Sequence, residues 1–131
     1  MHPRLQAEWA ELDSAYPGVQ HHEQPERVEV EIDLDGALFT PTRTRVAVLI
    51  PPGYPNTGPD GFLVPAGLQM TGGLPAGDAS GAGMPGWLLV SFHMFDANGQ
   101  STWKPTADPG RGDNVIGYLC SIESFLARGC N

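Results

Sequence analysis

The chain has 131 residues and a formal net charge of −8, with only seven Lys and Arg residues in total. This length fits one domain with its own hydrophobic core, and so few basic residues argue against nucleic-acid binding. No apolar run of about 18 residues occurs, and residues 1–13 carry charges where a signal peptide needs an apolar segment, so we expect a cytoplasmic protein with no membrane partner.

The first segment predicts an amphipathic helix. Four large apolar residues recur at helical spacing: Leu5, Trp9, Leu12 and Tyr16. Pro17-Gly18 then ends the helix. The polar residues from His21 to Pro25, which include His22, predict a solvated loop.

Two strands are expected next. From residue 28, apolar and acidic residues alternate strictly: Val28, Val30, Ile32 and Leu34 against Glu29, Glu31, Asp33 and Asp35. This pattern predicts a half-buried strand with one acidic face. After a turn at Asp35-Gly36, a second strand is expected over Arg45–Ile50. Arg43 and Arg45 are expected to lie across from the acidic face, each pairing contributing about 0.2–1 kcal/mol.

The segment 46–62, VAVLIPPGYPNTGPDGF, is the most informative part of the chain. A run of strand-forming apolar residues leads directly into a group of prolines, which prevent further strand pairing and hold the backbone extended or turned. We therefore expect a rigid elbow over Pro51–Pro59 that lies on the surface, with Tyr54 fixing it to the core.

The second half predicts two more strands and a helix. Strands are expected over Gly61–Val64 and Trp87–Phe92. Between them, residues 66–86 carry seven glycines and predict a long loop that builds no packed element. Residues 93–112 are irregular. A helical stripe over Val115–Leu126 follows, with Asp113 or Asn114 as its N-cap and Gly129 just past its end.

Strands that follow one another without intervening helices imply an antiparallel arrangement. The predicted fold is therefore α+β: a β-meander of about four strands packed against an N-terminal and a C-terminal helix, in a single domain over residues 1–131.

Four segments, taken in this order, resemble the ubiquitin-conjugating enzyme superfamily. RLQAEWAELDSAYP resembles its N-terminal helix, VLIPPGYPNTGP its strands and YPxxPP elbow, Trp103-Lys104-Pro105 the W-x-P after its active-site loop, and YLCSIESFL the following helix. The resemblance covers most of the chain except the glycine-rich segment. The divergence and the short length indicate a compact bacterial member.

The resemblance implies a transferase. Such a protein accepts a ubiquitin-like protein from a cognate activating enzyme as a cysteine thioester and passes it to a target protein, with no metal or organic cofactor. The activating enzyme would dock on the first helix, with Arg4, Glu8 and Trp9 as the expected contact residues.

The chain departs from the family at the nucleophile. It has no His-Pro-Asn, and no cysteine occurs in the ten residues before Trp103. If Gly86-Trp87-Leu88-Leu89 takes the place of the family's Gly-x-Ile-Cys, Leu89 occupies the nucleophile position, and a leucine cannot form a thioester. Either the chain is non-catalytic or the nucleophile has moved.

Two cysteines are present. Cys120 lies on the apolar stripe of the last helix and is interpreted as a small buried hydrophobe. Cys130 follows that helix and is the best candidate nucleophile, since Arg128 would lower the pKa of its thiol, although the helix C-terminus works against a thiolate.

Other residues are assigned supporting roles around Cys130. His93 would donate a hydrogen bond to an oxyanion or act as base, Trp103 and Pro105 would support the active-site loop, and Asp108 would activate an incoming amine. Two alternatives stay open: a non-catalytic module that binds a ubiquitin-like protein or its activating enzyme, and an interaction subunit that binds peptides at the elbow.

Overall fold

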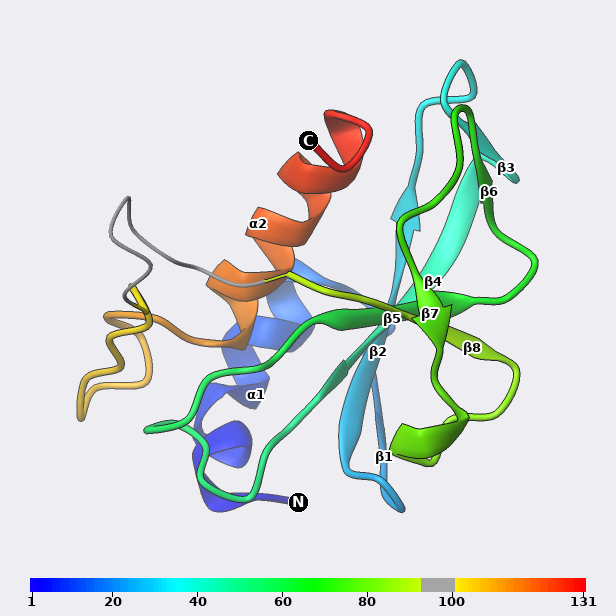
Figure 1. Cartoon of the computed structure of the whole chain (residues 1–131). Helices are drawn as coiled ribbons and strands as arrows, with labels where there is room; N and C mark the ends of the chain where they lie inside the picture. The colour runs from blue at the N-terminus through cyan, green and yellow to red at the C-terminus, as the bar shows by residue number, and fades with distance from the viewer. Residues whose placement is uncertain (93–100) are drawn as a thin grey trace.

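The computed structural model describes residues 1–92 and 101–131 of the chain. It is α+β, as the sequence predicts, with a six-stranded antiparallel sheet and two long helices, α1 (Pro3–Ala15) and α2 (Val115–Ala127). Both helices lie on the same side of the sheet (Figure 1). Among the described residues, neither helix has the length and apolar composition needed to cross a membrane.

The sheet order is β1-β2-β4-β5-β8-β7. Its strands are β1 (Gln20–His22), β2 (Arg27–Asp33), β4 (Arg43–Leu49), β5 (Phe62–Pro65), β8 (Trp87–Val90) and β7 (Gly77–Asp78). A separate two-stranded sheet joins β3 (Phe39–Thr40) to β6 (Gln69–Met70). The predicted four-strand meander is the central part of this sheet, whereas β1 and β7 are additional edge strands.

The strand β1 corrects the prediction of a solvated loop at this place. His21 pairs with Val28 and His22 pairs with Arg27, so the chain folds back on β2 as a hairpin. The two histidines therefore point to opposite faces of the sheet, because successive strand residues alternate in direction.

The main core lies between the sheet and the two helices. Alternate residues of the central strands face the helices and are buried there: Val28, Val30, Ile32, Val46, Val48, Phe62, Val64 and Val90. Leu5 and Leu12 from α1 and Leu119, Ile122 and Leu126 from α2 pack against them. The spacings found in the sequence thus produce one sheet face and two helix stripes that bury each other.

The glycine-rich segment is packed, which corrects the prediction for residues 66–86. Ala79 and Met84 are 1% and 4% exposed and lie with Ala47 and Leu63 in a second apolar cluster on the other face of the sheet. Figure 1 shows the segment around β7 on the side of the sheet away from the helices. The segment achieves this with short elements, β7 and a 3-10 turn at Ser80–Ala82, which its composition hides.

The acidic face of β2 is neutralised by arginines, as predicted. Glu29 accepts hydrogen bonds from Arg45 Nε at 3.1 Å and from Arg27 Nε at 2.8 Å, and Arg43 Nε lies 2.8 Å from Glu31 Oε2. The two guanidinium groups cover Glu29, which is only 6% exposed.

Candidate functional site

The segments that carry the family resemblance meet at one end of the molecule. Here the elbow (Pro51–Pro59) contacts the Trp103 loop, by which we mean residues 101–113. The indole nitrogen of Trp103 donates a hydrogen bond to the Pro55 carbonyl at 2.7 Å. A side chain at Gly58 would place its Cβ 2.6 Å from Trp103 Cδ2, so only glycine lets the indole lie this close to the elbow.

Aromatic contacts extend this assembly to α2. The ring centroid of Trp103 lies 6.2 Å from that of Tyr54 in the elbow and 6.3 Å from that of Tyr118 in α2. The Tyr118 hydroxyl donates to the Phe92 carbonyl and accepts from the Gly61 amide, both at 2.8 Å. Four segments far apart in the sequence are therefore fixed relative to one another.

A buried carboxylate lies at the centre of this assembly. Glu8 is 2% exposed and accepts hydrogen bonds from the Tyr54 hydroxyl, the Val115 amide at 3.0 Å and Arg4 Nε at 3.2 Å. Burial and the hydrogen bond to Glu8 raise the pKa of Tyr54 above its ordinary value, so this hydroxyl stays protonated and donates. The carboxylate also lies at the first turn of α2, where the helix dipole favours a negative charge.

These contacts change the interpretation of the first helix. Glu8 was expected to contact an activating enzyme, but its burial excludes that. Arg4 is turned inward as well: it pairs with Glu8, and its Nη1 donates to the Thr106 carbonyl at 2.7 Å. Trp9 is half-buried, with its ring edge-on to His21 at 6.4 Å.

The sequence contains a signal for the buried Glu8. It lies three residues after Leu5 and four before Leu12, and this spacing places it on the apolar stripe. A charged residue on a buried stripe requires a partner in the core.

The rest of the Trp103 loop is held by its own hydrogen bonds. The Lys104 amide donates to Asp113 at 2.6 Å, the Asp113 amide donates to the Lys104 carbonyl at 3.1 Å, and Pro105 forms a bridge with Gly112. Asp108 is exposed and accepts from the Gly110 amide at 2.9 Å. The structure thus places Trp103, Pro105 and Asp108 in one loop, with Asp108 closing a local turn.

The two possible N-caps of α2 have different roles. Asn114 is the N-cap, since its side-chain oxygen accepts from the Gly117 amide at 2.8 Å. Asp113 instead closes the Trp103 loop through Lys104.

Cys130 belongs to the C-terminal cap of α2. The Gly129 amide donates to the Leu126 carbonyl and the Cys130 amide to the Phe125 carbonyl, both at 2.9 Å, and Gly129 has a φ of 67°. This pattern is a Schellman motif, in which Cys130 occupies the position that commonly makes an apolar contact with the helix. Its side chain is half-buried and packs against the main core.

The environment of Cys130 does not favour a thiolate. Burial raises the pKa of the Cys130 thiol, which is opposite to the direction expected from Arg128. The guanidinium of Arg128 is used elsewhere, because its Nε donates to the Asn131 carbonyl at 2.9 Å.

Cys130 and the Trp103 loop lie at opposite ends of α2, as Figure 1 shows. Trp103 contacts Tyr118 in the first turn, and the nine residues from there to the end of α2 at Ala127 correspond to about 14 Å of helix, after which the cap with Cys130 follows. The candidate nucleophile is therefore not brought together with Trp103, Pro105 or Asp108. His93, the fourth group expected at this site, lies outside the described residues.

Leu89 and Cys120 also have defined places. Leu89 is paired with Leu63 of β5 and with Gly77 of β7, so the position that the resemblance assigns to the nucleophile lies within β8. Cys120 is exposed, which corrects its interpretation as a buried hydrophobe. Its sulfur lies 3.5 Å from the Tyr16 hydroxyl, which donates to Glu123 at 2.7 Å.

A mainly apolar pocket of about 330 Å³ lies where the elbow leaves the sheet. Its lining includes Leu49, Ile50, Pro51, Pro52, Gly61 and Leu63. The lining also includes the carboxyl groups of Glu26 and Asp60 but no cysteine, so the pocket supports binding better than thioester formation.

Comparison with protein-family models, with curated proteins and with solved structures finds no match to this chain. The described part of the chain offers an assembly around Glu8, Tyr54 and Trp103, and a cysteine at a distance from it.

Proposed function

We propose that the chain is a non-catalytic domain of ubiquitin-conjugating type, which binds a ubiquitin-like protein or its activating enzyme without forming a thioester. The observation that carries this proposal is the separation between Cys130 and the Trp103 loop along α2. A thioester carrier needs a reactive thiolate in the groove where the acceptor is positioned. Cys130 has a raised thiol pKa and a structural role in a helix cap.

The ubiquitin-conjugating type is supported by contacts between the motifs of the resemblance. The elbow receives the Trp103 indole, the indole contacts Tyr118 of the last helix, and Tyr54 of the elbow bonds to Glu8 of the first helix. Segments that resemble the family only in sequence order are thus also neighbours in space. Leu89 within β8 supports the non-catalytic form of the proposal, because its side chain offers no group that can be acylated.

The proposal is tested with the ubiquitin-like protein and the activating enzyme of the same genome. Binding of each to the immobilised chain is measured by interferometry, and a mixture of all three with ATP is run on a non-reducing gel. We expect saturable binding of at least one partner, equal affinity for Cys130→Ser, and no thiol-sensitive conjugate.

Two outcomes would overturn the proposal. A thiol-sensitive conjugate that is lost in Cys130→Ala but kept in Cys120→Ala would establish the chain as a thioester carrier with Cys130 as nucleophile. If neither partner binds, the chain is not a module of this conjugation system.

A further inference from the structure

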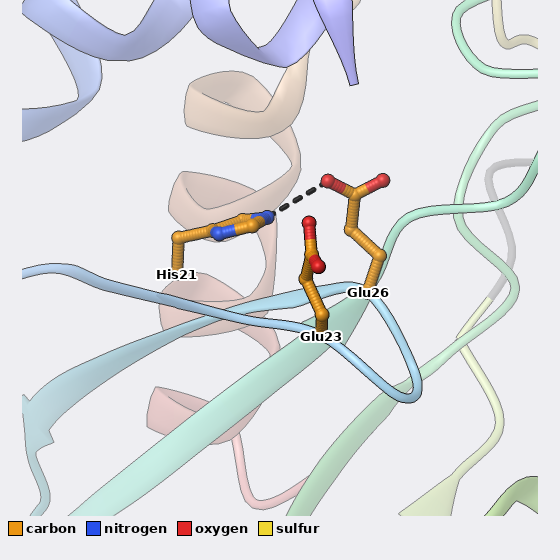
Figure 2. Close-up of side chains that lie close together, drawn as sticks. All are labelled: His21, Glu23 and Glu26. Atoms are coloured by element: carbon orange, nitrogen blue, oxygen red, sulfur yellow. Dashed lines mark hydrogen bonds and ion pairs between the residues drawn. The ribbon is translucent and has the colours of Figure 1, made fainter. Parts of the chain in front are cut away.

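Three possible metal ligands converge on the turn between β1 and β2. They are His21 from β1, Glu23 from the turn, and Glu26 immediately before β2. Figure 2 shows the three side chains pointing toward one another, and one donor atom from each lies within 4.8 Å of the other two. The cluster shares no residue with the assembly around Glu8, and His2 lies between them, since its amide donates to Glu26 and its ring packs edge-on against Tyr54.

Two of the three side chains are held in position by the fold. The side chains of His21 and Glu26 are only 16% and 25% exposed, and the Nε2 of His21 lies 2.7 Å from Glu26 Oε2. The same carboxylate oxygen accepts from the His2 amide at 2.8 Å, and the ring of Trp9 packs edge-on against His21. Glu23 is 63% exposed and forms the side open to solvent, through which an ion can enter.

The charge of the cluster distinguishes it from the other acidic groups of the chain. Glu8 is paired with Arg4, Glu29 with two arginines, and Glu31 with Arg43. Glu23 pairs with the N-terminal ammonium at 3.4 Å, and within the part of the chain that the structure describes neither Glu23 nor Glu26 forms an ion pair with a Lys or Arg side chain. One ammonium group offsets only one of the two carboxylates, so the cluster still attracts a cation.

We propose that His21, Glu23 and Glu26 form a binding site for a divalent transition-metal ion such as Zn²⁺, with water as its fourth ligand. One imidazole nitrogen and two carboxylate oxygens are a donor set suited to zinc, and a hard oxygen-only ion such as Mg²⁺ has less use for the nitrogen. Because the two fixed ligands belong to a hairpin, the ion would join β1 to the start of β2.

The geometry requires only small movements. Neighbouring ligand atoms around a tetrahedral zinc ion are about 3.3 Å apart, given bonds of about 2.0–2.1 Å. The His21–Glu26 pair therefore opens by about 0.6 Å from its present 2.7 Å, replacing one hydrogen bond by two metal bonds. Glu23 is the exposed ligand, and it completes the site by rotating its side chain away from the N-terminal ammonium, which lies 3.4 Å from it.

Zinc binding is measured by isothermal titration of ZnCl₂ into the chelator-treated protein. We expect one site in the wild type, at least about tenfold weaker binding in His21→Ala and in Glu26→Gln, and a smaller loss in Glu23→Gln. His22→Ala is the matched control, since this neighbouring histidine points to the opposite face, where its Nε2 lies 3.0 Å from Gln20 Oε1. Its affinity should stay within about twofold of the wild type.

Trp9 gives a second readout that does not depend on comparing affinities. A paramagnetic ion such as Co²⁺ at His21 lies close to the Trp9 ring, so Co²⁺ should quench wild-type tryptophan fluorescence. Zn²⁺ should displace Co²⁺ and restore the signal. In Trp9→Phe the quenching should be lost while zinc binding in the calorimeter is kept.

A dissociation constant for zinc above about 1 mM in the wild type would overturn the proposal. An equal loss of zinc affinity in His21→Ala and His22→Ala would overturn the proposal as well, because such a result would indicate unspecific binding by exposed histidines. Glu23→Gln keeps the test valid if the other two variants unfold, since an exposed side chain on a turn is not needed for folding; unchanged zinc affinity in this variant would remove Glu23 from the site.

Discussion

At the scale of single residues, the carboxylate of Glu8 links three segments of the chain. Its hydrogen bonds reach Arg4 on its own helix, Tyr54 in the elbow and the first amide of α2. Hydrogen-bond donors thus face both carboxylate oxygens of Glu8. If a glutamine replaced Glu8, its NH₂ group would face one of these donors in either orientation of the side-chain amide.

Glu8→Gln is therefore expected to destabilise the protein by about 3–5 kcal/mol, because it also leaves the charge of Arg4 without its partner. Urea denaturation monitored by circular dichroism measures this change. Glu11→Gln on the exposed side of the same helix is the control and should cost less than about 0.5 kcal/mol. A loss of less than 1 kcal/mol in Glu8→Gln would show that the buried carboxylate does not organise this region.

A second residue-scale prediction concerns Cys130. Since burial raises the pKa of its thiol, the thiolate fraction near pH 8 is smaller in the folded protein than in the unfolded chain. In a Cys120→Ser background, iodoacetamide should modify Cys130 several-fold more slowly in the folded state than in urea, and raising the pH should increase the folded-state rate. Mass spectrometry of quenched samples gives both rates. Faster modification in the folded state would indicate an activated thiol and favour the catalytic alternative.

At the scale of elements, the Trp103 loop is shaped by one glycine. Gly112 has a φ of 68°, and a Cβ there would lie 2.8 Å from the Lys104 carbonyl oxygen. This close approach closes the Pro105–Gly112 bridge and so positions Trp103 against the elbow.

Gly112→Ala is expected to destabilise the protein by about 1–3 kcal/mol and to shift the tryptophan emission, because the loop has to open and expose the Trp103 indole. Gly110→Ala, two residues away, meets only the ends of the Glu11 and Asp108 side chains at 3.2 and 3.4 Å and serves as the control. Thermal melts and emission spectra of the two variants should differ. Equal behaviour would mean that the left-handed backbone at Gly112 is not needed.

The long elements were predictable and the short ones were not. The strict alternation over Val28–Ile32 and the stripe from Val115 to Leu126 contain enough residues to define a period. Strands β1 and β7 have only three and two residues, so they show no period, and Gly77-Asp78 even has the composition of a turn. They form because an already built sheet offers them an edge.

The candidate site shows the same limit at the scale of the whole molecule. The contact between Trp103 and Pro55 joins residues 48 apart in the sequence, and local patterns carry no information about such a pair. The distance between Cys130 and this contact follows from the length of α2 and was predictable. The role of Cys130 in the helix cap was not, because it depends on the left-handed backbone at Gly129. His21, Glu23 and Glu26 are near in sequence, but their convergence depends on β1 folding back onto β2.

The whole molecule is built on a sheet that is covered on both faces, and the second covering is the unexpected one. Glycine-rich residues 77–86 place Ala79 and Met84 over Ala47 and Leu63, while Leu49, Trp87 and Leu89 pack around them half-buried. Met84 is the largest side chain that the segment contributes, so this cover depends on it most.

Met84→Ala should therefore lower the free energy of unfolding by about 2–4 kcal/mol, since the substitution removes a buried side chain and leaves a cavity over the sheet. Urea denaturation measures this loss, and limited proteolysis should show earlier cleavage within residues 77–86. Met70→Ala on β6, where the side chain is only half-buried, is the control and should cost less. If both variants lose the same amount of stability, the apolar cluster around Met84 adds little to the stability of the fold, and residues 77–86 lie on the sheet without stabilising it. If Met84→Ala is the more damaging change, the glycine-rich segment is part of the folded core, and its many glycines serve to bring a short chain close to the sheet.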